Sequence, residues 1–434
     1  MAVPWVYIGD LPAHEGEEVQ LKCWMYNKRS SGKIHFLQLR DGTGFIQGVV
    51  VKGEVPEEQF LSTRNLWLEA SLEVTGKVRR DERAPSGFEL NVTGVKILQN
   101  PTDEYPIGKK DHGIDFLLDN RHLWLRSASQ RAVMRIRERV IWSAREYLHD
   151  NGFLLVDSPI LTGAIGEGAS SLFEVPYFDL GKAYLAQTGQ LYAEAAAAAF
   201  GKVYTFGPTF RAEKSKTRRH LTEFWMIEPE VAFYDHVDNM TLQENLVSYI
   251  VEKVLEHCRA ELALIGRDTS PLELVKPPFH HISYDDAVIM LQKLGCPMRY
   301  GADFGGEDET ILTRQFDRPL FVECYPKKVK AFYMKQHPER EDLVLCDDLL
   351  APEGYGEIIG GSQREDSLDL LLARIREEKL PEDSYDWYLD LRKYGTFVHS
   401  GFGMGIERVV AWVCGLPHIR ETIPFPRTIY RLNP

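Results

Sequence analysis

The sequence predicts an α+β protein with two domains, a small β-barrel followed by a larger domain of helices and strands. The chain of 434 residues is 44% hydrophobic and 26% charged, so it exceeds one typical domain and can bury at least two cores. Residues 1–100 hold only short β-type runs. The first long amphipathic helical pattern spans residues 130–150.

Residues 1–100 contain five runs of alternating or branched apolar residues, separated by turn signals such as Asp41-Gly42. Five short strands favour a Greek-key barrel of the OB type. Such a barrel can stack an unpaired base on an exposed aromatic ring and read the edge of the base with an amide. Phe36 and Gln47 lie on adjacent predicted strands and suit these roles, although taken alone they fit a core ring and a surface amide better.

A polar, proline-containing linker is predicted over residues 101–126, followed by the second domain over residues 127–434. Its first helix is expected to stop at Asn151-Gly152 and to feed an apolar strand. Pro159 in that strand cannot donate to a β-ladder, so it belongs at an edge or a bulge. Residues 240–345 are interpreted as a helical insertion.

Composition excludes several classes of protein. The formal charge of −13 argues against a protein that coats nucleic acid without specificity, and the six cysteines form no CxxC pair, so structural zinc and a disulfide framework are not expected. The first residues lack a basic stretch followed by an apolar run, and no stretch is long and apolar enough to span a membrane. We therefore expect a cytoplasmic location and no membrane partner.

Three separated segments carry chemistry suited to ATP. FRAEKSKTRRHLTEF at 210–224 places Arg211 and Glu213 two residues apart, so both project from one face of a strand where arginine can grip a phosphate. GEIIGGSQR at 356–364 sets a carboxylate and an arginine around a glycine pair, a layout suited to Mg²⁺ beside a polar substrate. GFGMGIER at 401–408 is rich in glycine, which allows a backbone or a flat ring to approach closely.

Together these segments resemble motifs 2 and 3 of the class II aminoacyl-tRNA synthetases. LLDNRHLWLR before residue 127 is similar to a pattern of the aspartate, asparagine and lysine subgroup, and the helix, strand and Pro159 match motif 1. The resemblance implies a mostly antiparallel catalytic sheet flanked by helices and a homodimer formed through residues 127–160. It also implies that the barrel reads the tRNA anticodon, and the residues implied in that contact are Lys28, Arg29, Phe36 and Gln47.

The resemblance implies a role for each residue at a motif position. Arg211 and Arg408 would be catalytic, because they would neutralise charge on ATP. The residues implied in ATP binding are Arg211, Glu213, Arg219, His220, Phe224, Glu357 and Arg408. Glu357 is the first candidate ligand for Mg²⁺ and Asp348 is the second. Relatives often carry a hydroxyl three residues after the glutamate, whereas this chain has Gly360.

Substrate choice is expected to lie in residues 162–194 and at Arg364. The residues implied in amino-acid binding are Glu167, Gln187, Gln190, Glu194 and Arg364. Aspartate enzymes of the subgroup carry an element QSPQxxxK whose lysine binds the substrate carboxylate, and this chain has Glu194 at that place. A carboxylate there would accept the amide protons of asparagine and repel aspartate by roughly 4 kcal/mol, which is about a thousandfold in affinity. Arg364 would donate to the amide oxygen.

The predicted function is therefore ligation of asparagine to its tRNA through an asparaginyl adenylate, with ATP and Mg²⁺. Three alternatives remain. An aspartate-charging enzyme, possibly accepting both tRNAs, is disfavoured by Glu194. An amidating relative that makes asparagine would not need the barrel with Phe36. A non-catalytic nucleic-acid-binding protein would have no reason to keep Arg211, Glu357 and Arg408.

Overall fold

The computed structural model describes residues 3–84, 86–108, 110–166, 171–215 and 217–434. The chain divides into two compact units, residues 1–112 and 113–434. This boundary lies inside the stretch that the sequence suggests as a linker, because residues 114–124 already form two short helices of the second unit. No helix in the described ranges is both long and apolar enough to cross a membrane.

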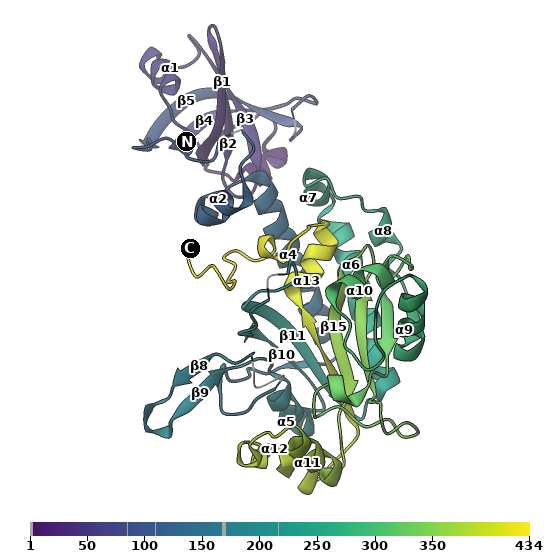
Figure 1. Cartoon of the computed structure of the whole chain (residues 1–434). Coiled ribbons are helices and arrows are strands. Elements are labelled where there is room, and N and C mark those ends of the chain that lie inside the picture. The colour runs from purple at the N-terminus through teal and green to yellow at the C-terminus, as the bar shows by residue number, and fades with distance from the viewer. Residues whose placement is uncertain (1–2, 85, 109, 167–170, 216) are drawn as a thin grey trace. The chain divides into compact units, whose positions relative to one another are not determined.

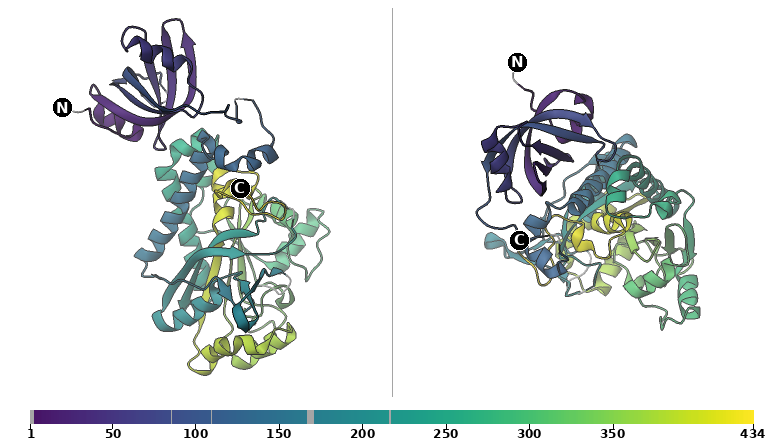
Figure 2. Two further views of the ribbon diagram at one scale, coloured as in Figure 1. Left: turned by 90° about the vertical axis from the view of Figure 1, so that its left-hand side faces the viewer. Right: turned by 90° about the horizontal axis from the view of Figure 1, so that it is seen from above.

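The first unit is a closed barrel with the strand order β1-β2-β3-β5-β4, which confirms the predicted OB-type fold (Figure 2). Its elements are β1 (Glu18–Ser31), β2 (Ile34–Arg40), β3 (Phe45–Val51), α1 (Glu57–Arg64), β4 (Ser71–Arg80) and β5 (Phe88–Gln99). Buried and half-buried residues alternate along β2 and β3, as expected where one face of a strand packs on a core. Leu37 and Leu39 point into the barrel, whereas Phe36 lies on the outer face.

The second unit is built on an eight-stranded sheet with the order β12-β13-β14-β15-β16-β11-β10-β6 (Figure 1). Its strands are β6 (Leu154–Leu155), β10 (Lys202–Phe210), β11 (Glu223–Ala232), β12 (His280–Ser283), β13 (Leu320–Glu323), β14 (Cys346–Ala351), β15 (Gly356–Gln363) and β16 (His399–Gly405). Only the terminal pairs β12–β13 and β10–β6 are parallel, so the predicted mostly antiparallel sheet is confirmed.

Three helices pack on one face of this sheet and build the main core: α4 (Ala128–Asp150), α6 (His236–His257) and α13 (Ile406–Cys414) (Figure 1). Local sequence fixes where they begin. The Ser127 hydroxyl accepts from the backbone N–H of Gln130, and Asp235 forms a capping box with Asp238. Ile136, Val140 and other apolar residues of α4 face the core at helical spacing.

Smaller elements complete the second unit. They are α2 (Ile114–Asp119), α3 (Arg121–Trp124), β7 (Leu161–Thr162), β8 (Glu174–Pro176), β9 (Lys182–Leu185), α5 (Gln190–Phe200), α7 (Arg259–Leu264), α8 (Ser270–Glu273), α9 (Tyr284–Lys293), α10 (Gly306–Thr313), α11 (Leu368–Glu377) and α12 (Asp386–Lys393). Residues 240–345 are not purely helical, because β12 and β13 extend the main sheet. Helices α5, α11 and α12 lie together at one end of the unit (Figure 1).

Candidate active site

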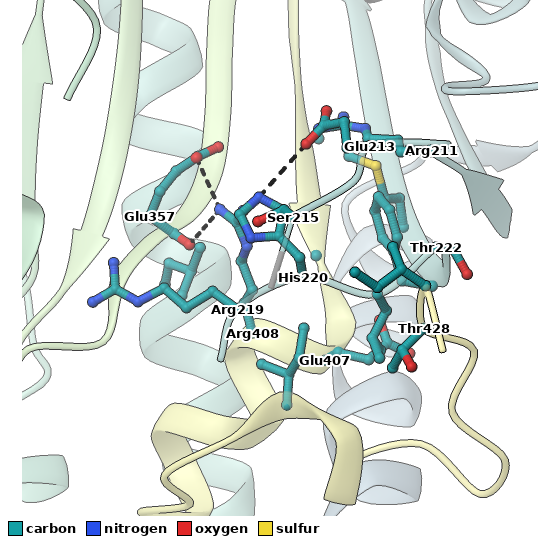
Figure 3. A pocket seen from close by; sticks show the side chains of 18 residues that line it. Arg211, Glu213, Ser215, Arg219, His220, Thr222, Glu357, Glu407, Arg408 and Thr428 are labelled. Atoms are coloured by element: carbon teal, nitrogen blue, oxygen red, sulfur yellow. Dashed lines mark hydrogen bonds and ion pairs between the residues drawn. The ribbon is translucent and has the colours of Figure 1, made fainter. Parts of the chain in front are cut away.

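All seven residues that the sequence associates with ATP line one cavity (Figure 3). They come from three places in the sheet. Strands β10 and β11 pair up to Phe210 and Glu223, and the connection between them carries Arg211, Glu213, Arg219 and His220. The other residues are Phe224 on β11, Glu357 on β15 and Arg408 in the first turn of α13.

Arg211 is held ready for a ligand. Its guanidinium carbon lies 5.4 Å from the centre of the Phe224 ring, within the range of a cation–π contact. Its Nε is buried and has no hydrogen-bond partner in the described part of the chain. Because buried donors are nearly always satisfied, this orphaned N–H indicates a place for an acceptor such as a phosphate oxygen.

Arg408 and Arg219 are both paired with carboxylates. Arg408 Nη1 donates to Glu357 Oε2 at 2.8 Å and to the backbone oxygen of Glu357 at 3.0 Å. Arg219 donates to Glu309 Oε2 at 2.6 Å. Gly356, at φ +76°, makes room for this second pair, because a Cβ there would clash with Glu309 Oε2.

His220 lies beside Glu213 in the same cavity. It contacts the hydroxyl of Thr217, and its Nε2 lies 3.6 Å from Glu213 Oε2. Burial and the nearby Arg408 lower the pKa of His220 below its ordinary value. The imidazole is therefore neutral at pH 7 and can offer one N–H donor.

Asp348 and Glu357 face each other across Gly360. A Cβ at Gly360 would lie 3.4 Å from Glu357 Oε1 and 3.7 Å from Asp348 Oδ1, so the hydroxyl side chain that relatives often place here is replaced by open space. Burial raises the pKa of Asp348 to about 6, while Lys330 opposes that rise. Against the effect of burial, Arg408 and Lys330 hold the pKa of Glu357 at about 2.

Two acidic residues suit Mg²⁺, which commonly takes one or two protein carboxylates and completes its shell with water and substrate phosphates. No group of three or more histidine, cysteine, aspartate or glutamate side chains in the described ranges is arranged as a metal cage. The donor set thus fits a cation that shares its ligands with a nucleotide better than a permanently bound structural ion.

The cavity of Figure 3 continues into a second cleft that also contains Arg211, Glu213 and Glu357. The further residues lining it include Thr188, Gln190, Glu228, Glu230, Lys330, Tyr333 and Arg364. Gln190 and Arg364 therefore lie in a cleft next to the residues that the sequence associates with ATP. Gln187 is buried and donates to Ser171 Oγ at 2.8 Å, and Glu167 lies outside the described residues.

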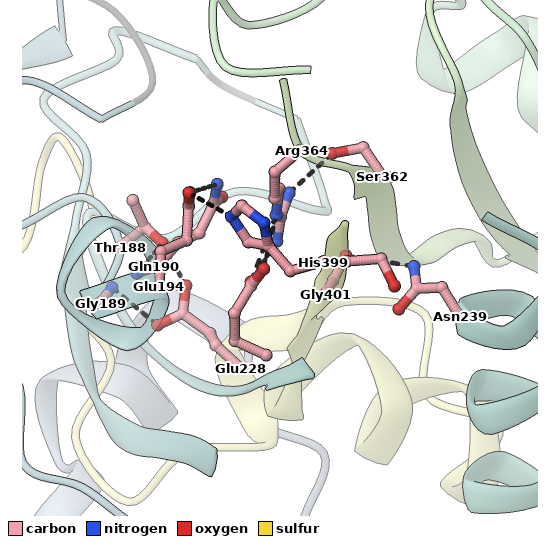
Figure 4. A network of polar contacts seen from close by, with 12 residues as sticks. Thr188, Gly189, Gln190, Glu194, Glu228, Asn239, Ser362, Arg364, His399 and Gly401 are labelled. Atoms are coloured by element: carbon pink, nitrogen blue, oxygen red, sulfur yellow. Dashed lines mark hydrogen bonds and ion pairs between the residues drawn. The ribbon is translucent and has the colours of Figure 1, made fainter. Parts of the chain in front are cut away.

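Arg364 is bound by two neighbouring side chains. Its Nε and Nη2 donate to the two oxygens of Glu230 at 3.1 and 2.8 Å, and Nη1 donates to Ser362 Oγ at 2.6 Å (Figure 4). Both charged side chains are almost completely buried. The cleft therefore presents a guanidinium whose charge is already neutralised.

Glu194 does not line either cleft. Its carboxylate accepts four hydrogen bonds from buried protein donors: Gln190 Nε2 at 3.0 Å, Tyr388 OH at 2.7 Å, Arg392 Nη2 at 2.8 Å and His399 Nε2 at 2.9 Å. Figure 4 shows the contacts to Gln190 and His399. Burial alone would raise the pKa of Glu194, but Arg392 and His399 hold it well below its ordinary value. The structure thus places this carboxylate behind Gln190, outside the lining of the second cleft, and its oxygens already accept hydrogen bonds from the protein.

Sequence reasoning missed two carboxylates in the cleft, Glu228 and Glu230. Glu228 is held by the hydroxyl of Thr188, the N–H of Gly189 at 2.8 Å and Thr205 Oγ1 at 3.1 Å. The signal was present, because both acids occupy alternate positions of the strand EFWMIEPEVA, which is apolar apart from these two and its first residue, Glu223. Two glutamates on one face of a buried strand require partners, and that requirement points to a polar site.

On the barrel, the residues predicted to meet the anticodon gather on one outer surface. This surface forms a broad hollow lined by Lys28, Arg29, Phe36 and Gln47 among others. The Arg29 guanidinium lies 4.4 Å from the centre of the Phe36 ring and donates to Gln47 Oε1 at 3.2 Å. Lys28 Nζ instead donates to the backbone oxygens of Arg64 and Leu66 at 2.7 and 2.6 Å.

The comparisons with known proteins agree with this geometry. The family described as class II tRNA synthetases (D, K and N) matches residues 113–429, and the OB-fold nucleic acid binding domain matches residues 19–98. The chain is 56% identical to the asparagine–tRNA ligase of Thermus thermophilus over 99% of this chain and all of that one. The same identity relates it to the asparagine–tRNA ligase of Chloroflexus aurantiacus, over 100% and 99% of the two chains.

Among solved structures, asparaginyl-tRNA synthetase from Pyrococcus horikoshii, complexed with asparaginyl-adenylate, superposes with a TM-score of 0.96. The two sequences are 48% identical, and the match covers 99% of each chain. A family model that covers most of the chain and relatives that span its full length lead to the same assignment. The chain belongs to the class II tRNA synthetases of the D, K and N group.

Proposed function

We propose that this chain ligates asparagine to its tRNA in two steps, first forming asparaginyl adenylate from asparagine and ATP, then passing the asparaginyl group to the tRNA 3′ end. The observation that carries this proposal is one continuous cleft. The predicted ATP residues line one end, and a charge-neutral arginine–glutamate pair lines the other.

In the first step the asparagine carboxylate attacks the α-phosphorus of ATP, and pyrophosphate leaves in line with the attack. This chemistry needs no protein nucleophile, so catalysis depends on positioning and on neutralising charge. Arg211, with its unsatisfied Nε, suits a non-bridging phosphate oxygen. Phe224 beside it offers an aromatic face for the adenine, and Arg408, paired with Glu357 of β15, lines the same cavity.

Asp348 and Glu357 would hold Mg²⁺ when ATP is bound. The ion would supply further charge neutralisation on the phosphates. The protein contributes the geometry of the site, since Gly360 leaves open space between the two carboxylates.

Selectivity for asparagine follows from the Arg364–Glu230 pair rather than from Glu194. Arg364 can still offer N–H groups to a carboxamide oxygen, because Nη1 and Nη2 each carry two hydrogens. A second carboxylate, such as that of aspartate, would meet a guanidinium already neutralised by Glu230 and would be repelled by that glutamate. A neutral side chain is therefore preferred.

In the second step a ribose hydroxyl of the terminal tRNA adenosine attacks the adenylate and AMP leaves. The barrel would bind the anticodon through Phe36, Gln47 and the neighbouring basic residues. A homodimer through residues 127–160 is supported by exposed apolar side chains there, among them Trp142 and Leu154, which are 53% and 48% exposed. A cytoplasmic location stays a prediction.

The deciding experiment is ATP–pyrophosphate exchange, measured in parallel with asparagine and with aspartate. Asparagine should support exchange and aspartate should not. A preference for aspartate would contradict the proposal. Glu230→Gln should reduce the ratio of exchange with asparagine to exchange with aspartate, because it frees the charge of Arg364 for a substrate carboxylate. Glu223→Gln is the matched control, since Glu223 lies on the same strand but outside the cleft lining.

A further inference from the structure

Lys330 occupies an unusual place beside the predicted metal ligands. It follows the turn 327–329, and its side chain is only 12% exposed. Its Nζ lies 2.6 Å from Asp348 Oδ2 and 3.9 Å from Asp303 Oδ1, and 3.9 Å from the centre of the Tyr325 ring. None of the motifs found in the sequence includes this lysine.

This contact matters because an ammonium group and a metal ion compete for the same carboxylate. Lys330 occupies one oxygen of Asp348, and Arg408 occupies one oxygen of Glu357 at 2.8 Å. Both predicted ligands are therefore paired with cations of the protein itself. A divalent cation that arrives alone must displace or approach two positive charges at a poorly solvated site, which weakens its binding.

ATP changes the competition between the protein cations and the metal ion for these carboxylates. Lys330 and Arg211 line the same cleft as Glu357, so a triphosphate bound there brings acceptor oxygens close to both cations. Phosphate oxygens can then take the place of the carboxylates as partners, and they are also ligands that Mg²⁺ prefers. The same charge that opposes the metal in the empty cleft thus favours the nucleotide that accompanies it.

We propose that Lys330 is a built-in counter-ion that suppresses metal binding at Asp348 until ATP is present, so that the metal and the nucleotide bind together. The inference rests on the proposed assignment of Asp348 and Glu357 as metal ligands. Lys330 acts as a positioning residue, and its effect is a coupling between the metal and ATP. By linkage, removing its charge should strengthen metal binding alone and reduce the mutual enhancement of the two ligands.

The test is a titration of the full-length protein with Mn²⁺, followed by electron paramagnetic resonance, without nucleotide and with α,β-methylene-ATP. K330M and K330Q should bind Mn²⁺ without nucleotide about tenfold more tightly than the wild type, or better. With the analogue the variants and the wild type should agree within about threefold. K327M makes the same change at a lysine of the same turn that does not line the cleft, and it should behave as the wild type.

K330Q is included because glutamine keeps a donor for Asp348 and spares the fold if K330M is unstable. A folded K330Q that binds Mn²⁺ no more tightly than the wild type without nucleotide would overturn the inference. Adding D348N to K330Q should abolish the gain, and a retained gain would also overturn it, because the metal would then sit elsewhere. Failure of the proposed function shows separately, as absence of asparagine-dependent exchange by the wild type.

Discussion

Two arginines of the same cleft, Arg211 and Arg364, differ in how far the surrounding protein satisfies their N–H donors. Arg211 keeps a buried Nε without a partner in the described part of the chain, whereas Arg364 is bound by Glu230 and Ser362 through three of its nitrogens. The first arginine lines the proposed nucleotide site, and the second lines the proposed amino-acid site.

The difference teaches how one cleft can accept two chemically unlike ligands. A triphosphate supplies its own negative charge, so the protein leaves donors unsatisfied to meet it. A carboxamide supplies no charge, so the protein must neutralise its own ions in advance.

The buried carboxylates of this unit also differ in whether a positively charged side chain neutralises them. Glu194 is compensated by Arg392 and His399. Asp347 forms no ion pair with an arginine or lysine of the described ranges, and a nitrogen of the His236 ring, whose pKa is lowered by burial, lies 3.6 Å from it.

The strongest test of this contrast is Arg211→Ala. Because Arg211 keeps an unsatisfied donor before ATP binds, its removal should leave the fold intact. Asparagine-dependent ATP–pyrophosphate exchange should fall by about a hundredfold to a thousandfold, the loss typical of removing a preorganised donor. Exchange kinetics measure the effect, and a thermal melt checks stability. Arg211→Lys should recover little, since a point charge cannot reproduce the guanidinium fork. Exchange within about tenfold of the wild type for Arg211→Ala would contradict the assignment.

Glu194, whose charge is neutralised by buried donors, provides the next test: Glu194→Gln should lower the stability of the protein more than its catalytic rate. The change leaves the buried Arg392 without its carboxylate, and breaking a buried ion pair costs about 3 kcal/mol of the free energy of unfolding. Urea denaturation measures this loss. The KM for asparagine should rise as well, because Glu194 holds Gln190, a cleft residue, while the KM for ATP should change little.

The control for this variant lies on the same helix. Ala198 is exposed, so Ala198→Gln introduces the same side chain into α5 without touching the network. A Glu194→Gln protein of unchanged stability that loses only asparagine binding would restore the role that the sequence suggests, direct contact with the substrate amide. It would also weaken the comparison between the two halves of the cleft.

The two halves also differ in how far the sequence could predict them. Phosphate binding is encoded locally: Arg211 and Glu213 lie on one short segment, and the glycines of GFGMGIER precede Arg408 directly, so the motifs identify the site. The fold of the barrel could also be predicted from the sequence, because five alternating runs separated by turns can form few closed sheets.

The environment of Glu194 could not be predicted in this way. Its partners Tyr388, Arg392 and His399 lie about two hundred positions away along the chain, and only tertiary packing brings them together. The same holds for Arg364 and Glu230, which are 134 positions apart. Lys330 was missed for a further reason, since a lysine in a loop has no sequence pattern that reveals a buried carboxylate partner.

Asp347, unlike Glu194, has no arginine or lysine partner in the described ranges, and this difference should appear in the pH dependence of stability. Burial raises the pKa of Asp347 from its ordinary value of 3.8 to about 7, with a smaller opposing effect of Gln243. Between about pH 4 and 7 the unfolded chain has released this proton while the native protein retains it, so the native state loses stability as the pH rises through this window. Asp347→Asn should lack that loss and should gain about 4 kcal/mol relative to the wild type between about pH 4 and pH 8.

Denaturation midpoints of both proteins across this pH range measure the difference. His236, whose Nδ1 lies 3.6 Å from Asp347, titrates in both proteins, so the direct effect of its protonation largely cancels. A difference in stability that does not change with pH would mean that Asp347 is ionised in the native protein, and the compensated and uncompensated carboxylates would no longer be distinguishable.

The smallest expected effect lies in the barrel, where Phe36 provides an aromatic surface on the outer face of β2. Stacking of one base on an aromatic ring contributes about 1–3 kcal/mol, so Phe36→Ala should raise the KM for tRNA about tenfold. Exchange without tRNA should stay unchanged, because the barrel takes no part in adenylate formation. Trp24→Ala removes another outward aromatic ring of the barrel and should leave the KM for tRNA as it is. An equal rise of the KM for tRNA in both variants would indicate general damage to the barrel. A rise for Phe36→Ala alone would show that the barrel, like the surroundings of Arg211, keeps a binding group available before its ligand arrives.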